Sequence, residues 1–235
     1  MSKPAIVLVH GAWADASCWN DVVVQLQTAG YPVYAPPNPL RGLASDAASI
    51  AGFLTHIGGP VVLVGHSYGG SVISVASASS DNVKALVYIG AFVPDTGESI
   101  LGLLGQYPAP PPDLFTPVPL PSGDVDLYFT PKYYGPVFAT GVPEKLSAIM
   151  AVTQRPVTAA AVGEAAPADL GWKTLPSWYV LGDLDEAIPP PLQRMMAERA
   201  KAVITHVSAG HPSMIQHPEA TVAAIAAACE GAGVS

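Results

Sequence analysis

Short apolar runs rich in β-branched residues alternate with helix-length stretches along this 235-residue chain, and this alternation restricts its fold more than any other feature. The apolar runs predict strands at residues 5–9, 31–35, 60–64, 83–89, 178–181 and 202–207. The stretches between them predict helices at residues 16–29, 43–56, 68–79, 190–201 and 218–229. Strands bounded by such helices pair in parallel, so the pattern predicts an α/β fold with a doubly wound, mostly parallel six-stranded sheet. Ligands of such sheets bind at the carboxyl ends of the strands.

One long segment interrupts this alternation. Between about Pro94 and Leu175 no strand of the same kind is present, and the proline run at 110–112 favours extended polyproline structure. A helix-like stretch near 144–152 and several aromatic residues argue against the alternative of a flexible linker, because disordered linkers are poor in aromatics. We therefore interpret residues 95–173 as a cap inserted into a core of residues 1–94 and 174–235. The aromatic residues of this segment are Phe115, Tyr128, Phe129, Tyr133, Tyr134 and Phe138.

Charge and hydropathy exclude two classes of partner. The chain has 10 Lys and Arg against 18 Asp and Glu, and its net charge of -8 repels nucleic acid and anionic membrane surfaces. No apolar run reaches the roughly 18 to 20 residues that a membrane-spanning helix needs. We therefore predict neither nucleic acid nor a membrane as a partner. Cys18 and Cys229 fit no metal or redox spacing and indicate reduced thiols in a cytoplasmic protein, with a disulfide between them as the alternative.

A single serine lies between glycines directly after a predicted strand. The pentapeptide Gly65-His66-Ser67-Tyr68-Gly69 is the chain's only Gly-x-Ser-x-Gly sequence, and a predicted helix follows it. Strand, sharp turn and helix are the setting in which this motif holds a catalytic nucleophile. We therefore predict Ser67 as a nucleophile; the alternative is a tight turn with an inert serine.

A serine nucleophile needs a neutral base, and the base needs a carboxylate to orient it. In this fold the carboxylate follows a late strand, and the predicted strand at 178–181 precedes Gly182-Asp183-Leu184-Asp185. We predict Asp185 as the acid because it comes before an Ile-Pro pair that begins a helix. Asp183 more simply braces the turn.

The base in this fold follows the last strand, where Ala209-Gly210-His211 stands. We predict His211 as the base, and we expect structural roles for His206, inside the strand, and His217, before a helix. A metal site built from these three histidines is disfavoured, since no His-Glu-x-x-His or paired-cysteine pattern is present. We expect no metal and no organic cofactor. His66 is predicted to point away from the cleft.

Attack of a serine on a carbonyl creates an oxyanion, which two preset N–H groups stabilise. The amide of Tyr68, directly after the nucleophile, is the first predicted donor. The second comes from the loop after the first strand, where Gly11 permits a tight turn, and we assign it to the amide of Ala12. We expect His10 to brace this loop rather than to contact substrate.

Four stretches resemble the α/β-hydrolase superfamily in order and spacing, particularly the small group of plant methylesterases, hydroxynitrile lyases and bacterial esterases. They read LVHGAWADASCW, LVGHSYGGSV, VLGDLDEAIPP and SAGHPSM. The resemblance covers nearly the whole core and only loosely the cap. It implies the same nucleophile, acid, base and oxyanion amides as the residues themselves. Ser67 departs from the aspartate of haloalkane dehalogenases and epoxide hydrolases, and Pro212 replaces the lysine of the hydroxynitrile lyases, which disfavours cyanohydrin cleavage.

These features together predict a serine hydrolase that cleaves a small, largely apolar, uncharged carboxylic ester or lactone through an acyl-enzyme intermediate. The aromatic residues of the cap and its few cations indicate the uncharged substrate, and we expect Trp13, Phe129 and Tyr133 to bind it. Two alternatives stay open. One is a receptor-like ligand-binding protein with little turnover, and the other is a cofactor-free lyase or perhydrolase with the same triad. A monomer and a homodimer are equally compatible with the sequence.

Overall fold

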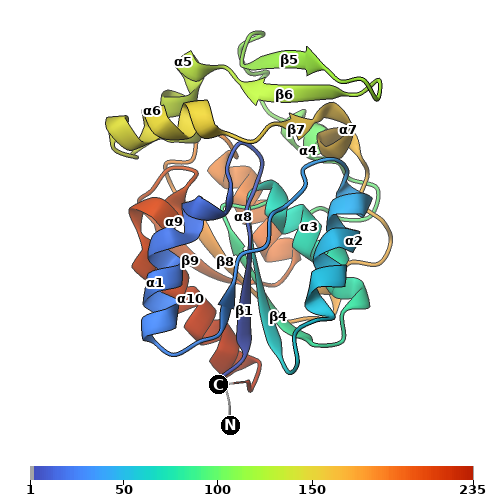
Figure 1. The fold of residues 1–235 in the computed structure, drawn as a ribbon, viewed down its shortest axis with the longest axis vertical. Coiled ribbons are helices and arrows are strands. Elements are labelled where there is room, and N and C mark those ends of the chain that lie inside the picture. The colour runs from blue at the N-terminus through green and yellow to red at the C-terminus, as the bar shows by residue number, and fades with distance from the viewer. Residues whose placement is uncertain (1–2, 235) are drawn as a thin grey trace.

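The computed structural model describes residues 3–234, and a six-stranded sheet lies at its centre (Figure 1). The strand order is β2-β1-β3-β4-β8-β9, and each neighbouring pair is parallel. The predicted α/β fold is therefore confirmed, although the second strand is only two residues long. The strands are β1 (Ala5–Val9), β2 (Val33–Tyr34), β3 (Val61–His66), β4 (Val83–Ile89), β8 (Ser177–Gly182) and β9 (Val203–Val207).

Helices cover both faces of this sheet and bury its side chains in two layers. Strand β1 shows why: its alternate residues point to opposite faces, so Val7 packs in one layer and Leu8 in the other. The first layer contains α2 (Leu43–Leu54), α3 (Tyr68–Ala76) and α8 (Pro190–Arg199); the second contains α1 (Asn20–Thr28) and α10 (Pro218–Gly231). Short turns η1 (Ala16–Trp19) and η2 (Ser77–Ser79) and helix α9 (Ser213–Gln216) complete these layers. None of the helices within residues 3–234 combines the length and the apolar character needed to cross a membrane.

Most of residues 95–173, hereafter the cap segment, lies over the carboxyl ends of the parallel strands (Figure 1). Its last residues, 171–173, pack instead against η2 beside the C-terminal end of α3. The segment contains an antiparallel sheet that the sequence analysis did not predict, with strands β5 (Phe115–Pro119), β6 (Val125–Phe129) and β7 (Val157–Thr158). Two prolines within β5 do not fit the usual strand pattern, so the sequence does not predict this strand. β5 tolerates them because it is an edge strand that pairs only with β6. Pro110 to Pro112 lie outside helices and strands. The predicted helix near 144–152 is present as α6 (Glu144–Thr153).

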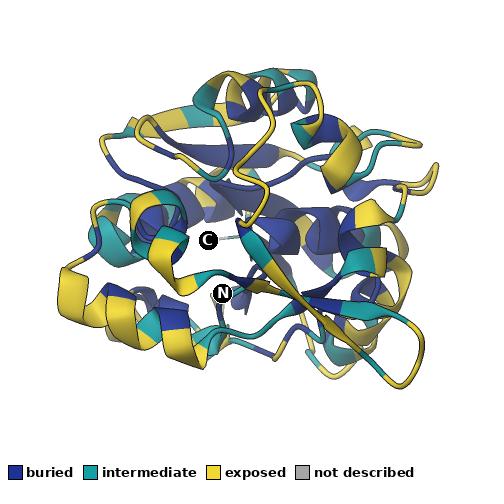
Figure 2. Ribbon diagram, turned by 90° about the horizontal axis from the view of Figure 1, so that it is seen from above, coloured by how far each residue is buried: buried dark blue, intermediate teal, exposed yellow. Residues whose placement is uncertain are grey.

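Short helices and turns connect these strands. They are α4 (Ile100–Leu104), α5 (Pro131–Tyr133), the π-helical turn η3 (Tyr134–Phe138), α6 (Glu144–Thr153), α7 (Ala159–Gly163) and the 3-10 turn η4 (Gly171–Lys173). The side chains of Phe129, Tyr134 and Phe138 are buried. They belong to one buried cluster with Val64 of β3 and Val87 of β4. Figure 2, seen from above, shows buried stretches in dark blue along many of the helices and strands.

Polar contacts between distant residues fasten the cap segment to the core. The guanidinium of Arg41 pairs with Asp126 of β6 at 2.6 Å and also donates to the carbonyl of Pro156 at 2.8 Å. The carboxylate of Glu164 accepts a hydrogen bond from the backbone N–H of Leu43 at 2.6 Å, at the first turn of α2. A carboxylate stabilises a helix at this end, where free N–H groups point outward. The cap segment therefore adds a second carboxylate to the one that Asp46 already places in the first turn of α2.

Cys18 and Cys229 are free thiols, and both are buried. Burial raises the pKa of each thiol. The predicted reduced state matches the structure, in which the two cysteines form no disulfide.

Candidate active site

Ser67 occupies the sharp turn between β3 and α3, with φ of 53° and ψ of −124°. A non-glycine residue in this left-handed region is strained and persists only where its surroundings enforce it. The carbonyl of Ser67 accepts hydrogen bonds from the N–H groups of Gly70 at 2.9 Å and Phe92 at 3.1 Å. A Cβ at Gly65 would lie 2.6 Å from the carbonyl oxygen of Gly69, so the turn closes only with glycine there. The glycines of the motif thus permit the strained serine.

His211 and Asp185 form a buried pair. Nδ1 of His211 lies 2.8 Å from Oδ2 of Asp185, and both side chains are almost inaccessible to solvent. Oδ1 of Asp185 accepts hydrogen bonds from the N–H groups of Ala187 and Ile188, each at 2.8 Å. Because the carboxylate can only accept, Nδ1 carries the proton of the neutral imidazole, and Nε2 remains able to take one. Asp183, the rejected candidate, lies elsewhere and contacts the exposed His206 at 2.8 Å.

Gln193 is a polar residue of this site that the sequence analysis missed. Its side chain is fully buried on α8, and Nε2 donates to Oδ2 of Asp185 and to the carbonyl of Ile188, both at 2.8 Å. Gln193 therefore helps to fix the orientation of the carboxylate. A single glutamine in a helix that also carries charged residues is typical of an exposed face, so only its burial reveals the role.

Two further buried histidines, His10 and His66, lie beside these residues. Nε2 of His10 accepts a hydrogen bond from the N–H of Asn38 at 3.0 Å, and Nδ1 lies 2.9 Å from the carbonyl of Gly11. Nε2 of His66 lies 3.2 Å from the carbonyl of His211, and the two rings are 4.6 Å apart between centroids. Burial lowers the pKa of His10 and holds that of His66 well below its ordinary value, so both rings stay neutral. His10 braces its loop as expected, and His66 packs behind His211.

Residues 10–14, hereafter the β1 loop, lie opposite the turn that holds Ser67. A Cβ at Gly11 would lie 2.6 Å from Cβ of Ser67, so only glycine allows the two turns to come this close. The backbone N–H groups of Ala12 and Tyr68 have no hydrogen-bond acceptor within residues 3–234. Trp13 has a φ of 56°, which makes it a second strained residue of this region.

A cavity of about 310 Å³ joins these residues. Ser67, His211, Ala12 and Tyr68 all contribute to its lining. The rest of the wall is mostly apolar and aromatic, with Trp13, Phe92, Leu104, Tyr107, Phe115 and Phe129 among its members. The exposed Glu186 contributes a carboxylate at the rim. This arrangement suits an uncharged apolar molecule with one polar group placed near Ser67.

Two of the three expected substrate contacts line this cavity, and one does not. Trp13 and Phe129 form part of the wall. Tyr133 is not among the residues that line the cavity, and its hydroxyl donates to Oδ1 of the exposed Asp113 at 2.8 Å. Its role as a substrate contact stays a prediction.

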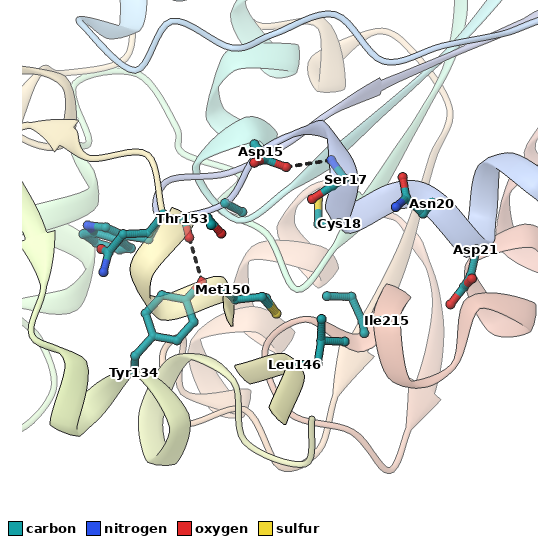
Figure 3. A pocket seen from close by; sticks show the side chains of 13 residues that line it. Asp15, Ser17, Cys18, Asn20, Asp21, Tyr134, Leu146, Met150, Thr153 and Ile215 are labelled. Atoms are coloured by element: carbon teal, nitrogen blue, oxygen red, sulfur yellow. Dashed lines mark hydrogen bonds between the residues drawn. The ribbon is translucent and has the colours of Figure 1, made fainter. Parts of the chain in front are cut away.

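Trp13 also contributes to the lining of a second cavity, of about 210 Å³. Figure 3 shows this second cavity. Asp15, Ser17 and Tyr134 line it together with side chains of α6. Figure 3 shows that the hydroxyl of Tyr134 points toward the β1 loop, where it makes a hydrogen bond. Trp13 is therefore a residue that both cavities share.

His206 and His217 have separate partners, and the exposed His56 lies 3.1 Å from a backbone carbonyl of α2. His206 contacts Asp183, and His217 lies 3.1 Å from Glu219. Within the described part of the chain, no three His, Cys, Asp or Glu side chains gather in a group that could hold a metal ion.

Comparisons with known proteins agree with this architecture. A sequence model of the alpha/beta hydrolase family matches residues 6–224. A carbendazim-hydrolysing esterase of Nocardioides sp. (strain SG-4G) is 36% identical over 121 residues, which cover 46% of this chain and 49% of that protein. This match thus spans about half the length of the relative. An alpha/beta hydrolase of Aspergillus novofumigatus (strain IBT 16806) is 28% identical over 244 residues, covering 94% of this chain and 95% of that protein.

Solved structures show the same fold at lower sequence identity. A crystal structure of polyneuridine aldehyde esterase has a TM-score of 0.81 at 18% identity and covers 96% of this chain and 98% of that chain. A pyrethroid hydrolase from Sphingobium faniae JZ-2 has a TM-score of 0.75 at 22% identity, with 95% and 96% covered. At these identities the likeness concerns the fold alone.

Proposed function

The chain belongs to the α/β hydrolase family, and we propose that it is a serine hydrolase of small, largely apolar, uncharged carboxylic esters or lactones. One observation carries the proposal: Ser67, His211 and the unpaired amides of Ala12 and Tyr68 line a single apolar cavity. The relatives are esterases and hydrolases, which supports ester hydrolysis as the reaction class.

In the proposed reaction, Oγ of Ser67 attacks the ester carbonyl while Nε2 of His211 takes the hydroxyl proton. Asp185 stabilises the resulting imidazolium through Nδ1. The carbonyl oxygen becomes an oxyanion, which accepts hydrogen bonds from the amides of Ala12 and Tyr68. The intermediate collapses, the C–O bond to the alcohol breaks, and His211 returns its proton to the leaving oxygen.

Water completes the cycle by the same route. His211 takes a proton from water as it attacks the acyl-enzyme, and the second intermediate releases the carboxylic acid and restores the hydroxyl of Ser67. The strained backbone at Ser67 supports this scheme, because it holds the side chain at the rim of the cavity before substrate arrives.

The wall of the cavity supports the proposed substrate class. No Lys or Arg side chain is among its lining residues in the described chain, and the volume of about 310 Å³ suits a molecule of modest size. An anionic acyl group would lose its hydration there without a compensating cation, and the carboxylate of Glu186 repels it at the exposed rim. We therefore propose esters and lactones whose acyl groups are uncharged.

Covalent labelling tests the proposal directly. Purified protein is incubated with a fluorophosphonate probe beside a Ser67→Ala control, and the adduct is located by intact mass and peptide mapping. We expect one adduct, on Ser67, followed by turnover of esters of varied acyl length. Absence of an adduct would overturn the proposal and favour the receptor-like alternative. Release of acid and alcohol in equal amounts, measured by product analysis, distinguishes hydrolysis from a lyase or perhydrolase reaction.

A further inference from the structure

All three polar groups of the strained Trp13 form hydrogen bonds with the cap segment. The backbone N–H of Trp13 donates to the carbonyl of Arg155 at 2.9 Å. The indole Nε1–H donates to the carbonyl of Leu127, on β6, at 2.7 Å. The carbonyl of Trp13 accepts a hydrogen bond from the hydroxyl of Tyr134 at 2.7 Å (Figure 3). All three partners lie in the cap segment, and none lies in the core.

Aromatic packing fixes the ring as well. The indole of Trp13 stacks on Phe115 with 4.9 Å between ring centroids, and it meets Phe129 edge to face at 5.2 Å. Both phenylalanines belong to the cap segment. An offset stack and an edge contact together leave an aromatic ring little freedom to tilt.

This anchoring bears on the proposed chemistry because Trp13 directly follows Ala12. A non-glycine residue leaves the left-handed region when its restraints are removed, since that conformation costs about 1 kcal/mol or more. The change in Trp13 would rotate the preceding peptide units, including the one that carries the N–H of Ala12. A donor misdirected by a fraction of an ångström no longer meets the oxyanion.

We propose that Tyr134 is a positioning residue: through its hydrogen bond to Trp13, the cap segment aims the Ala12 amide at the oxyanion. The inference rests on the proposed function, and it assigns to the cap segment a part in the reaction itself. Tyr134 begins the π-helical turn η3, a rare geometry that is common at functional sites. Burial raises the pKa of Tyr134, so its hydroxyl remains a donor at all working pH values.

Tyr134 is the partner that a substitution can isolate. The other two partners of Trp13 are backbone carbonyls that accept its N–H groups, and side-chain changes do not remove them. Tyr134 also lies outside the lining of the cavity that contains Ser67, so its substitution leaves the substrate contacts in place. Tyr134→Phe deletes the hydroxyl and retains the ring.

The experiment compares Tyr134→Phe with a matched control, Tyr128→Phe. Tyr128 lies on β6 and is 36% exposed, and its hydroxyl has no hydrogen-bond partner within residues 3–234. Active sites are counted with the fluorophosphonate probe, and kcat and KM for 4-nitrophenyl butyrate are expressed per labelled site. For Tyr134→Phe we expect about tenfold lower kcat, with KM and the pH profile unchanged. The control keeps the wild-type kcat.

Counting sites separates positioning from stability. A variant that only folds less well has fewer labelled sites and a normal kcat per site, and this result would overturn the proposal. A second variant, Trp13→Phe, removes the indole N–H that donates a hydrogen bond to the carbonyl of Leu127. Its loss of kcat should be less than additive with that of Tyr134→Phe, because both changes release the same residue. Full additivity would contradict a shared role.

A readout without turnover separates this inference from the proposed function. The amide resonance of Ala12 in a nitrogen-15 spectrum should move in Tyr134→Phe and stay in place in Tyr128→Phe. If it moves while wild-type protein neither labels nor hydrolyses esters, the serine hydrolase proposal fails and the positioning contact stands. If it does not move, Tyr134 does not position Ala12.

Discussion

The two strained residues beside the cavity are held by different parts of the molecule. Ser67 and Trp13 have nearly the same φ, 53° and 56°. The carbonyl of Ser67 accepts from Phe92 in the core, and its N–H faces the carbonyl of Ile89 on β4 at 3.4 Å. Within residues 3–234, all the hydrogen bonds of Trp13 go to the cap segment. The strained backbone of the nucleophile therefore depends on the parallel sheet, whereas that of Trp13 depends on the cap segment.

Removing the nucleophile gives the largest expected effect. Ser67→Ala should lower ester turnover by about 10⁴-fold or more and leave the free energy of unfolding nearly unchanged. Hydrolysis assays and urea unfolding measure the two quantities. Ser71→Ala is the matched control, since Ser71 is a buried serine of α3 whose hydroxyl has no partner within residues 3–234. Turnover that survived in Ser67→Ala would place the chemistry elsewhere.

Forcing the two strained turns apart should have the next largest effect. In Gly11→Ala the new methyl group would lie 2.6 Å from Cβ of Ser67 and 2.8 Å from the carbonyl of His66, so one turn must shift. We expect about 100-fold lower kcat/KM and a loss of about 1–3 kcal/mol in stability. Gly58→Ala, where a Cβ meets nothing within 4 Å, serves as the control. Wild-type kinetics in Gly11→Ala would show that the turns need not be so close.

Low pH should destabilise both turns, because each contains one buried neutral histidine. These are His10 in the β1 loop and His66 directly before Ser67. Burial lowers the pKa of His10 and of His66, whereas in the unfolded chain they titrate near 6.5, so unfolding takes up protons below that pH. Stability should fall between about pH 6.5 and 5, by up to about 1.4 kcal/mol per pH unit for each histidine. Urea unfolding at a series of pH values measures the slope, and His10→Gln should reduce it. A flat profile would mean that neither ring resists protonation.

Removing one polar contact between the cap segment and the core should have the smallest effect. It should affect the β1 loop and leave the turn at Ser67 unchanged. Arg41→Met removes the ion pair with Asp126 and the hydrogen bond to Pro156. Because the Arg41 side chain is 41% exposed, we expect only a two- to fivefold lower kcat. Combined with Tyr134→Phe, the effect should be less than additive. A larger loss than that of Tyr134→Phe would show that the ion pair dominates.

The parts of the site that the sequence predicts are those whose signals are local. The turn at Ser67 lies within five consecutive residues between a strand and a helix, and Asp185 and His211 each follow a strand at a fixed place. The six-stranded sheet follows likewise from apolar runs. The roles of these residues in catalysis stay predictions, which the labelling experiment tests.

The parts that the sequence does not predict depend on contacts between distant residues. Tyr134 reaches Trp13 across 121 positions, and no local pattern marks either residue as one of a pair. Gln193 resembles an exposed helical residue until α8 is packed on the sheet. The antiparallel strand β5 has prolines at positions where strand patterns exclude them, and only its place at an edge accommodates them.

The carboxylate that caps α2 has a consequence for how the chain folds during synthesis. Glu164 follows Leu43 by 121 residues, so α2 leaves the ribosome long before this carboxylate, with Asp46 as the acidic residue of its first turn. Strand β4 waits in the same way for β8, because Leu86 pairs with Ser177. A nascent chain that has reached only the cap segment therefore exposes an unpaired β4 edge and an α2 without its contact to Glu164. Chains truncated before residue 177 should aggregate through this β4 edge, which pairing with residues 177–182 covers.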